Sequence, residues 1–172
     1  PELLEPLTLT RPAFDLRCGL TTLAEKQRLA MGASEVGVLM RAPLAPVYRQ
    51  RHPSVAVNDP DWFRGDDVLM VNARWLPPDD SFVLPSRSCV GMVGDGIAFV
   101  MMKKDQSTTI HFEELQDRLR QSLDTSPPLA AGGRLITYAW DLVDQNAQEI
   151  RRDFRWLGPA AQAAQSSGQK HS

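Results

Sequence analysis

The sequence predicts a single mixed α/β domain, and three observations carry this prediction. An almost continuous apolar run at 68–75 is typical of a buried strand, and a second run at 92–100 contains the Asp-Gly pair of a hairpin turn. Segments with helical spacing of apolar residues lie on both sides of these runs. With 172 residues, 42% of them hydrophobic, the chain is long enough to bury a core without disulfides or a metal.

The N-terminal part is expected to be a loop followed by a helix. Prolines interrupt residues 3–14, which favours a loop. Thr22 and Glu25 have the spacing of a capping box, so a helix is predicted over 23–31, and Gly32 is suited to end it.

The middle of the chain is predicted to hold short strands separated by prolines. Residues 35–40 and 55–57 are expected to be strands, and 47–51 a turn of helix between them. The run at 68–75 is predicted to be a strand buried on both faces, and 92–100 a hairpin.

Two amphipathic helices are predicted to complete the domain, which we place at residues 1–158. The apolar face of the first helix is formed by Phe112, Leu115, Leu119 and Leu123, and that of the second by Val143, Ala147, Ile150, Phe154 and Leu157. Trp140 is expected in the core rather than stacked on a ligand, with Asp141 as a cap at the start of the helix. Residues 159–172 are rich in Ala, Gln, Ser and Gly and are predicted to be a disordered tail.

Composition excludes several classes of function. Nineteen basic and 21 acidic residues give a net charge of −2, which argues against nucleic acid or a membrane surface as partner. Cys18 and Cys89 have no metal-ligand spacing, and a reducing cytoplasmic compartment fits them. No apolar run approaches the length needed to span a bilayer, and the first residues lack a signal-peptide pattern.

One segment combines cations, a glycine and a helix N-terminus. Arg11, Arg17 and Lys26 flank Gly19 and the expected helix start at Thr22. Free backbone N–H groups and the helix dipole add to guanidinium and ammonium charge, so this segment is a candidate phosphate site.

The same residues also allow a purely structural interpretation. Arg11 and Arg17 would then pair with Asp15 and Glu25, and Lys26 would be a solvated helix residue.

Several motifs occur in the order found in one enzyme family. They are Pro6-Leu7-Thr8-Leu9-Thr10-Arg11-Pro12, Leu16-Arg17-x-Gly19, Thr22-x-x-Glu25-Lys26, Val71-Asn72-Ala73-Arg74-Trp75-Leu76-Pro77, Gly94-Asp95-x-Ile97-Ala98, and Trp140-Asp141-Leu142-Val143 with Asn146, Ile150, Asp153 and Phe154. Together they resemble the sugar nucleotidyltransferases similar to the N-terminal part of GlmU, the UDP-N-acetylglucosamine pyrophosphorylase. The resemblance spans about residues 3 to 157.

This resemblance implies a Rossmann-like mixed sheet flanked by helices, whose first strand would precede Pro1. It implies a nucleoside triphosphate and a sugar 1-phosphate as substrates and Mg²⁺ as cofactor. The sugar phosphate would attack the α-phosphorus and release pyrophosphate, a reaction that depends on positioning and charge neutralisation. A β-helix acyltransferase domain commonly follows in GlmU-like chains and is not contained in this one, and a homo-oligomer is left open.

Site residues carried over by position fall into two groups. Arg17 and Lys26 correspond to basic residues of the nucleotidyltransferase signature and are the expected catalytic residues. The expected substrate-binding residues are Arg11, Gly19, Thr22, Asn72 and Arg74.

The sequence departs from the family pattern at two places. The G-x-G-x-R phosphate loop is absent, and Asn72-Ala73-Arg74 stands where an active enzyme has the G-D pair whose aspartate meets magnesium. Because arginine cannot ligate a cation, three alternatives follow. The metal is held elsewhere, with Asp59, Asp79 and Asp80 as candidates; the arginine replaces the metal charge; or catalysis has been lost.

These alternatives lead to competing functions. The first is a sugar-1-phosphate nucleotidyltransferase. The second is a non-catalytic sugar-nucleotide-binding or assembly module of the same fold, and the third is a structural interaction domain.

Overall fold

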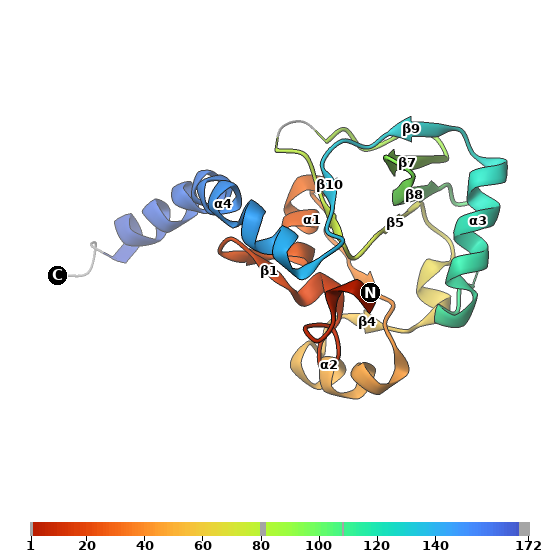
Figure 1. The fold of residues 1–172 in the computed structure, drawn as a ribbon, viewed down its shortest axis with the longest axis horizontal. Helices are drawn as coiled ribbons and strands as arrows, with labels where there is room; N and C mark the ends of the chain where they lie inside the picture. The colour runs from red at the N-terminus through yellow and green to blue at the C-terminus, as the bar shows by residue number, and fades with distance from the viewer. Residues whose placement is uncertain (1, 80–81, 108, 169–172) are drawn as a thin grey trace.

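A computed structural model describes residues 2–79, 82–107 and 109–168 and shows a mixed α/β fold (Figure 1). The strands are β1 (Arg17–Cys18), β2 (Thr21–Thr22), β3 (Gly37–Val38), β4 (Ala56–Val57), β5 (Val68–Val71), β6 (Trp75–Leu76), β7 (Cys89–Val93), β8 (Gly96–Met102), β9 (Pro128–Ala130) and β10 (Arg134–Leu135). The α-helices are α1 (Leu23–Met31), α2 (Ala45–Arg51), α3 (Leu115–Thr125) and α4 (Ala139–Gly168). Short 3-10 turns occupy Glu2–Leu4, Ala13–Asp15, Ala42–Leu44, Pro60–Phe63 and Phe112–Glu114.

The main sheet is mixed and has the strand order β5-β8-β7-β9. β8 is antiparallel to both β5 and β7, while β7 and β9 are parallel. The predicted hairpin is confirmed, but its turn is Gly94-Asp95 and the positive φ, +57°, is at Gly94 rather than at the predicted Asp95-Gly96 pair, because Gly96 already pairs with Val93. Three two-stranded ladders join the remaining segments: β1 with β2 and β6 with β10 are antiparallel, and β3 with β4 is parallel.

The single buried strand predicted over 68–75 is wrong, because the chain bends after β5. Asn72 donates its amide to the carbonyl of Ile97 at 2.8 Å and accepts the backbone N–H of Arg74 at 3.0 Å. Trp75 then starts β6, which pairs with β10 instead of β8. β5 is consequently an edge strand in the described part of the main sheet, and only its first residue, Val68, is buried.

Helix α1 begins and ends where the local sequence predicts. The hydroxyl of Thr22 accepts the N–H of Glu25, and the Glu25 carboxylate accepts the N–H of Thr22. Gly32 ends the helix in the left-handed region, at φ +60°. The buried Gln27 donates to the carbonyls of Asn72 and Trp75, which attaches α1 to the bend after β5.

Helix α4 differs most from its prediction. Its apolar stripe faces solvent: Trp140, expected in the core, is 59% exposed, and Val143 and Phe154 are 73% and 64% exposed. Asp141 does act near the helix start, where its carboxylate accepts the N–H groups of Thr137 and Tyr138.

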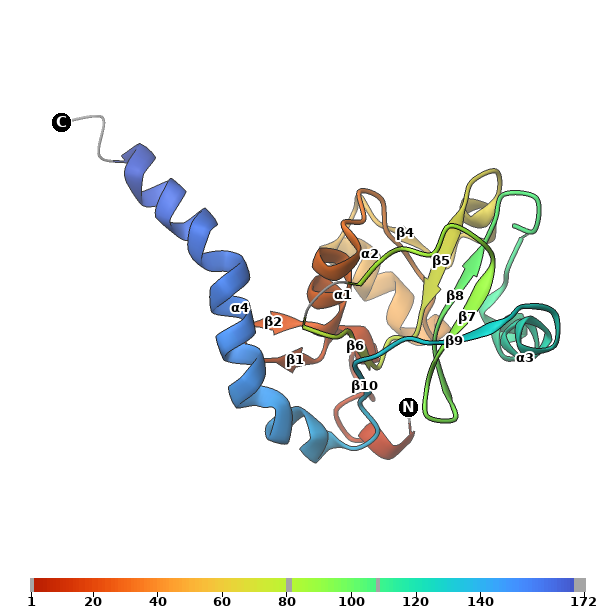
Figure 2. The same ribbon diagram turned by 90° about the horizontal axis from the view of Figure 1, so that it is seen from above.

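The face that α4 turns to the domain is mainly charged. It buries Glu149, Arg152 and Asp153 beside Leu142. Figure 2 shows α4 running alongside β1 and β2. The helix also continues through Gly168, so residues 159–168, predicted as disordered, are helical, in keeping with the high helix propensity of Ala and Gln; residues 169–172 lie outside the described residues.

A close approach of backbones joins β6 and β10. Gly133, at φ +70°, lies so near the chain that an added Cβ would be 2.2 Å from the carbonyl oxygen of Leu76. One residue earlier, the carbonyl of Gly132 accepts the indole N–H of the fully buried Trp75 at 3.0 Å. This loop therefore positions the largest side chain of the core.

We expect Gly133→Ala to destabilise the protein more than Gly94→Ala. Both residues have a positive φ, so each alanine is strained by about 1 kcal/mol. Only at Gly133 does the new methyl group also meet backbone atoms, which adds about 1–3 kcal/mol. Urea unfolding followed by circular dichroism measures both changes, and equal losses in the two variants would contradict the packing described here.

Candidate functional site

The segment predicted to bind phosphate lies against α4. Asp153 of α4 points into the turn between β1 and β2, where one carboxylate oxygen accepts the N–H groups of Leu20 and Thr21 at 2.7 and 3.2 Å. The other oxygen accepts the Thr21 hydroxyl at 3.0 Å and the Lys26 ammonium at 2.5 Å. Asp153 thus receives four donors in a site from which water is excluded.

A second carboxylate completes the charge balance around Lys26. Glu149 lies one helical turn before Asp153, and its Oε2 is 3.0 Å from Lys26 Nζ and 3.5 Å from Arg152 Nη1. Arg152 donates in turn to the carbonyls of Pro77 and Pro78, at 2.8 and 2.9 Å. Lys26 and Asp153 have no exposed surface. We call Lys26, Glu149, Arg152 and Asp153 the buried ion cluster.

The backbone donor of Gly19 is also bound by a side chain of α4. Gly19 has φ +82° and donates its N–H to the amide oxygen of Asn146 at 2.7 Å. A Cβ at this position would be 2.6 Å from the Asp153 carboxylate, so the glycine permits close approach of α4. The backbone donors that were predicted to hold a phosphate therefore hold side chains of α4.

Four predicted site residues lie in or near this turn. Lys26 is enclosed in the buried ion cluster, so it is not the solvated residue of the structural interpretation, and a phosphate could reach it only if α4 moved. Thr22 caps α1. Arg17 is exposed and donates to the carbonyl of Leu20 at 3.0 Å, and Arg11 is exposed without an ion pair in the described part of the chain. The predicted pairs of these arginines with Asp15 and Glu25 are likewise not seen among the described residues.

The remaining predicted residues, Asn72 and Arg74, lie together at the end of β5. Both side chains are half-buried. Besides the contacts of Asn72 given above, Arg74 places Nη1 3.4 Å from the carbonyl of Ile136. The bend holds the Arg74 side chain at the carboxyl end of a strand, where ligands of α/β sheets commonly bind.

Three cationic segments meet near this end of β5. Phe14, Met40 and Ala73 belong to one hydrophobic cluster, and they are sequence neighbours of Arg11, Arg41 and Arg74. The Arg41 guanidinium donates to the carbonyl of Thr8, which ties the loop that carries Arg11 to the end of β3.

An asparagine joins the ends of β3 and β4 in the same region. Asn58 follows β4 in the left-handed conformation, at φ +52°. Its amide group donates to the Met40 carbonyl at 2.9 Å and its oxygen accepts the Met40 N–H at 2.8 Å. Asparagine side chains therefore fix the carboxyl ends of the three strands β3, β4 and β5. Arg41 and Arg74 follow β3 and β5 along the chain.

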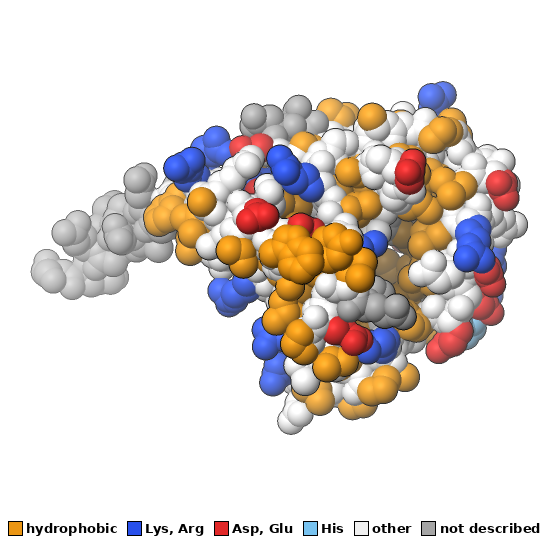
Figure 3. Space-filling model, viewed as in Figure 1, with side chains coloured by type: hydrophobic (Ala, Val, Ile, Leu, Met, Phe, Trp, Pro, Cys, Tyr) orange, Lys and Arg blue, Asp and Glu red, His pale blue; other side chains and the backbone are white. Residues whose placement is uncertain are grey.

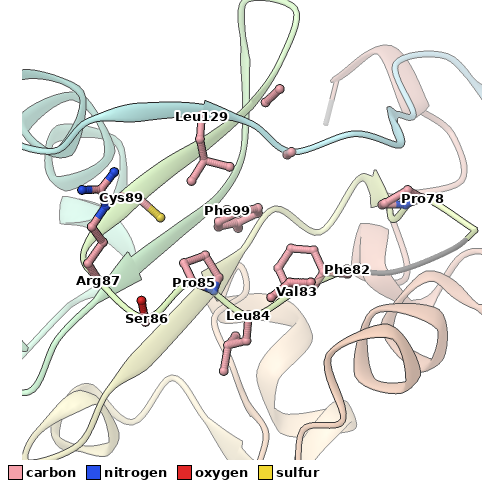
Figure 4. A pocket seen from close by; sticks show the side chains of 12 residues that line it. Pro78, Phe82, Val83, Leu84, Pro85, Ser86, Arg87, Cys89, Phe99 and Leu129 are labelled. Atoms are coloured by element: carbon pink, nitrogen blue, oxygen red, sulfur yellow. The ribbon is translucent and has the colours of Figure 1, made fainter.

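A cavity of about 400 Å³ lies elsewhere, between β7, β9 and the segment 82–87 (Figure 4). Phe82, Phe99, Leu84 and Leu129 line it, and Arg87 is the one cation among its lining residues, at the end away from Pro78. A second hollow of about 350 Å³ lies beside Leu29, Asp79 and Trp156. Neither is lined by a predicted catalytic or substrate-binding residue, although Asp79, a candidate metal ligand, borders the second. The apolar lining of the first does not suit a triphosphate.

The described residues do not form a preassembled magnesium site. No group of three His, Cys, Asp or Glu side chains converges in the described ranges. Of the predicted ligands, Asp59 accepts the N–H of Asp61 in its own turn, and Asp79 pairs with Arg152 and Arg155. Asp80 lies outside the described residues.

The two cysteines are buried and suited to packing rather than chemistry. Burial, reinforced by the nearby Glu149 charge, raises the pKa of Cys18 to about 11, although Lys26 acts in the opposite direction. Burial also raises the pKa of Cys89. Because the thiolate is the reactive form, neither residue is an activated nucleophile.

Sequence reasoning missed Glu149 and Arg41, which help to organise the site. Asp153 and Asn146 were named only as part of the family motif on the C-terminal helix, and their contacts with the Gly19 turn were not predicted. Arg41 lies in a proline-rich stretch without a motif.

Comparison with known proteins gives one match. A protein-family model described as sugar nucleotidyl transferase matches residues 2–160, which include every strand and the helices α1 to α3. The mixed sheet flanked by helices is consistent with the Rossmann-like fold expected for such proteins. Searches of curated proteins and of solved structures return no match. No helix in the described part of the chain is long and apolar enough to cross a bilayer.

We expect Lys26→Met to lower the free energy of unfolding by about 3–5 kcal/mol, because it leaves two buried carboxylates without their cation. Urea unfolding measures the loss, and Lys104→Met, at an exposed lysine, is the matched control with no expected change beyond about 0.5 kcal/mol. If the two variants were equally stable, the buried ion cluster would not support the fold.

We expect Cys18 to resist alkylation in the folded protein. In a Cys89→Ala background, iodoacetamide should label Cys18 slowly at pH 8 and rapidly after unfolding in urea. Equal labelling of the folded and unfolded chains at pH 8 would contradict the burial of Cys18.

The raised pKa of Cys18 also makes stability depend on pH. Because the folded pKa of about 11 exceeds that of an unfolded thiol, the contribution of this thiol to stability is complete below the unfolded pKa and is lost as pH rises through 11.

Proposed function

Because this chain belongs to the sugar nucleotidyltransferase family, we propose that it transfers a nucleotidyl group from a nucleoside triphosphate to a sugar 1-phosphate. In this reaction a phosphate oxygen of the sugar bonds to the α-phosphorus, the bond from that phosphorus to the β-phosphate oxygen breaks, and pyrophosphate leaves. UTP and N-acetylglucosamine 1-phosphate are the first substrates to test, given the resemblance to UDP-N-acetylglucosamine pyrophosphorylases.

The observation that carries this proposal is the family match over residues 2–160. The chain segments that carry Arg11, Arg41 and Arg74 support a location for it, because Phe14, Met40 and Ala73 of these segments share one hydrophobic cluster at the strand ends. Both substrates are phosphate esters, and arginine binds phosphate oxygens in pairs through its planar guanidinium.

These arginines would act by position and charge. Negative charge shifts onto the leaving pyrophosphate as its bond to the α-phosphorus breaks, and fixed cations stabilise that charge without reorganising. Arg74 is suited to this role because the Asn72 bend holds its backbone and the Ile136 carbonyl lies within reach of its guanidinium.

Catalytic roles for Arg17 and Lys26 are less consistent with the geometry. The enclosure of Lys26 favours a structural role for it. Arg17 is exposed but donates to its own turn, so it remains a candidate phosphate contact whose substitution belongs in the same test.

Magnesium stays a prediction from the resemblance. In nucleotide-dependent enzymes Mg²⁺ is commonly bound by one or two carboxylates together with the substrate phosphates, so we propose that it enters this site with the nucleotide.

The alternative function is a module that binds a sugar nucleotide without turning it over. The observation that favours it is that the N–H groups of Gly19, Leu20 and Thr21 are already paired with α4, so they do not offer a phosphate cradle. Calorimetric titration with UDP-N-acetylglucosamine separates this alternative from a purely structural domain, for which no heat of binding is expected.

We expect the purified protein to release pyrophosphate when it is given UTP, N-acetylglucosamine 1-phosphate and Mg²⁺. Arg11→Gln and Arg74→Gln should each lower kcat/KM by about 10²-fold, because each removes a fixed cation from the developing charge. A coupled pyrophosphate assay measures both changes.

Arg120→Gln provides the matched control, because it removes an exposed arginine on α3 outside the proposed site. Absence of turnover with every pairing in a panel of nucleotides and sugar phosphates would overturn the enzymatic function. Turnover that is indifferent to Arg11, Arg17 and Arg74 would overturn the location.

A further inference from the structure

Helix α4 presents an apolar stripe that nothing in the described structure covers. Trp140, Val143 and Phe154 are 59%, 73% and 64% exposed, and Ala147 between them is exposed as well. Ile150 completes the stripe and is half-buried. Contiguous exposed apolar side chains of this size are uncommon on monomers and mark interaction surfaces.

The spacing of the stripe indicates what kind of surface it is. Positions 140, 143, 147, 150 and 154 alternate steps of three and four residues, which is the a/d pattern of a coiled coil. The other side of the helix is committed to the domain, because Leu142, Glu149 and Asp153 are buried there. The stripe is therefore not a misplaced core face, since α4 cannot turn it inward without breaking the buried ion cluster.

The stripe is accessible to a second helix. In two perpendicular views α4 runs along one side of the domain, and its C-terminal part projects beyond it (Figures 1 and 2). Hydrophobic side chains gather over the beginning of α4 and the adjoining N-terminal segment (Figure 3). There Trp140 stacks on Tyr138, with ring centroids 4.4 Å apart and planes 8° from parallel, which makes one end of the stripe a rigid aromatic surface.

Charges beside the stripe identify the partner. Asp144 and Arg151 are at the e positions of the two heptads, both are exposed, and neither forms an ion pair in the described part of the chain. They carry opposite charges one heptad apart. A helix with this arrangement is complementary to itself when the second copy runs in the opposite direction.

The register of such a pair follows from coiled-coil geometry. In an antiparallel pair, a positions face d positions, so Val143 meets the partner's Phe154 and Ala147 meets the partner's Ile150, each contact occurring twice. In that same register e positions face each other, which places Asp144 opposite the partner's Arg151. A parallel pair would instead set e against g, and the g residues Asn146 and Asp153 are already bonded within their own chain.

We propose that α4 pairs with α4 of a second copy of this chain as an antiparallel, two-fold-symmetric coiled coil through Trp140, Val143, Ala147, Ile150 and Phe154. Both copies use the same surface, as a closed two-fold dimer requires. The interface is independent of the proposed activity, since it shares no residue with the end of β5.

Sedimentation velocity of the full chain over a range of concentrations tests the proposal. We expect a dimer whose dissociation constant rises about 100-fold in Val143→Asp and in Phe154→Asp, because each places a carboxylate in the apolar seam. Val83→Asp is the matched control: Val83 is 79% exposed on another surface, and its substitution should leave the dimer unchanged. Circular dichroism confirms that each variant is folded.

Charge reversal tests the orientation of the two helices. Asp144→Arg and Arg151→Asp should each weaken the dimer roughly tenfold, equivalent to about 1.4 kcal/mol, and the double variant should restore it. Asp124→Arg, at an exposed acid on α3, is the control for net charge.

Three results would overturn the proposal. The first is a monomer at all concentrations, and the second is a dimer that tolerates both Val143→Asp and Phe154→Asp. The third is a dimer that the single reversals weaken but the double reversal does not restore, because the helices would then not lie antiparallel in this register.

Discussion

The ammonium of Lys26 has no contact with water, and its charge is balanced by Asp153 and Glu149 on α4. An isolated buried ammonium costs several kcal/mol, so this cation can exist in the core only while both carboxylates remain beside it. Because Lys26 belongs to α1 and Asp153 also holds the β1–β2 turn, one charge balance fixes three elements together. The buried ion cluster therefore determines the position of α4, including which of its faces packs on the domain and which is exposed.

The cluster explains why the turn resembles a phosphate site. A glycine with positive φ, free N–H groups, a lysine and a helix start are the components with which proteins bind an anion. Here the anion is the Asp153 carboxylate, which accepts from Leu20, Thr21 and Lys26 much as a phosphate would. These donors therefore do bind an anion, but the anion is a carboxylate of the same chain rather than a phosphate. Lys26 is thereby engaged within the chain, and the proposed substrate contacts are Arg11, Arg41 and Arg74, with Arg17 as a further candidate.

The same constraint accounts for the orientation of α4. A helix with one apolar and one charged face normally buries the apolar face, since that removes the most nonpolar surface from water. In α4 the charged face is buried because its carboxylates meet a cation and backbone donors of fixed position. The apolar stripe with Val143 and Phe154 is then left outside, and a second copy offers it the burial that the domain does not. The proposed catalytic site and the proposed dimer interface accordingly lie on separate surfaces of one chain.

Short-range signals in the sequence determined the local structure. The capping box of Thr22 and Glu25, the left-handed Gly32 and the hairpin turn at Gly94 each depend on residues no more than a few positions apart, so reading the chain was sufficient to predict them. Tertiary structure alone decided that the run at 68–75 bends at Asn72, whose partner Ile97 lies on another strand. It also decided that Lys26 is a core residue, because Asp153 lies 127 positions away. A charged residue whose counterion is far away in the sequence looks like an exposed residue, because no local sequence pattern shows which distant residue the fold will place beside it.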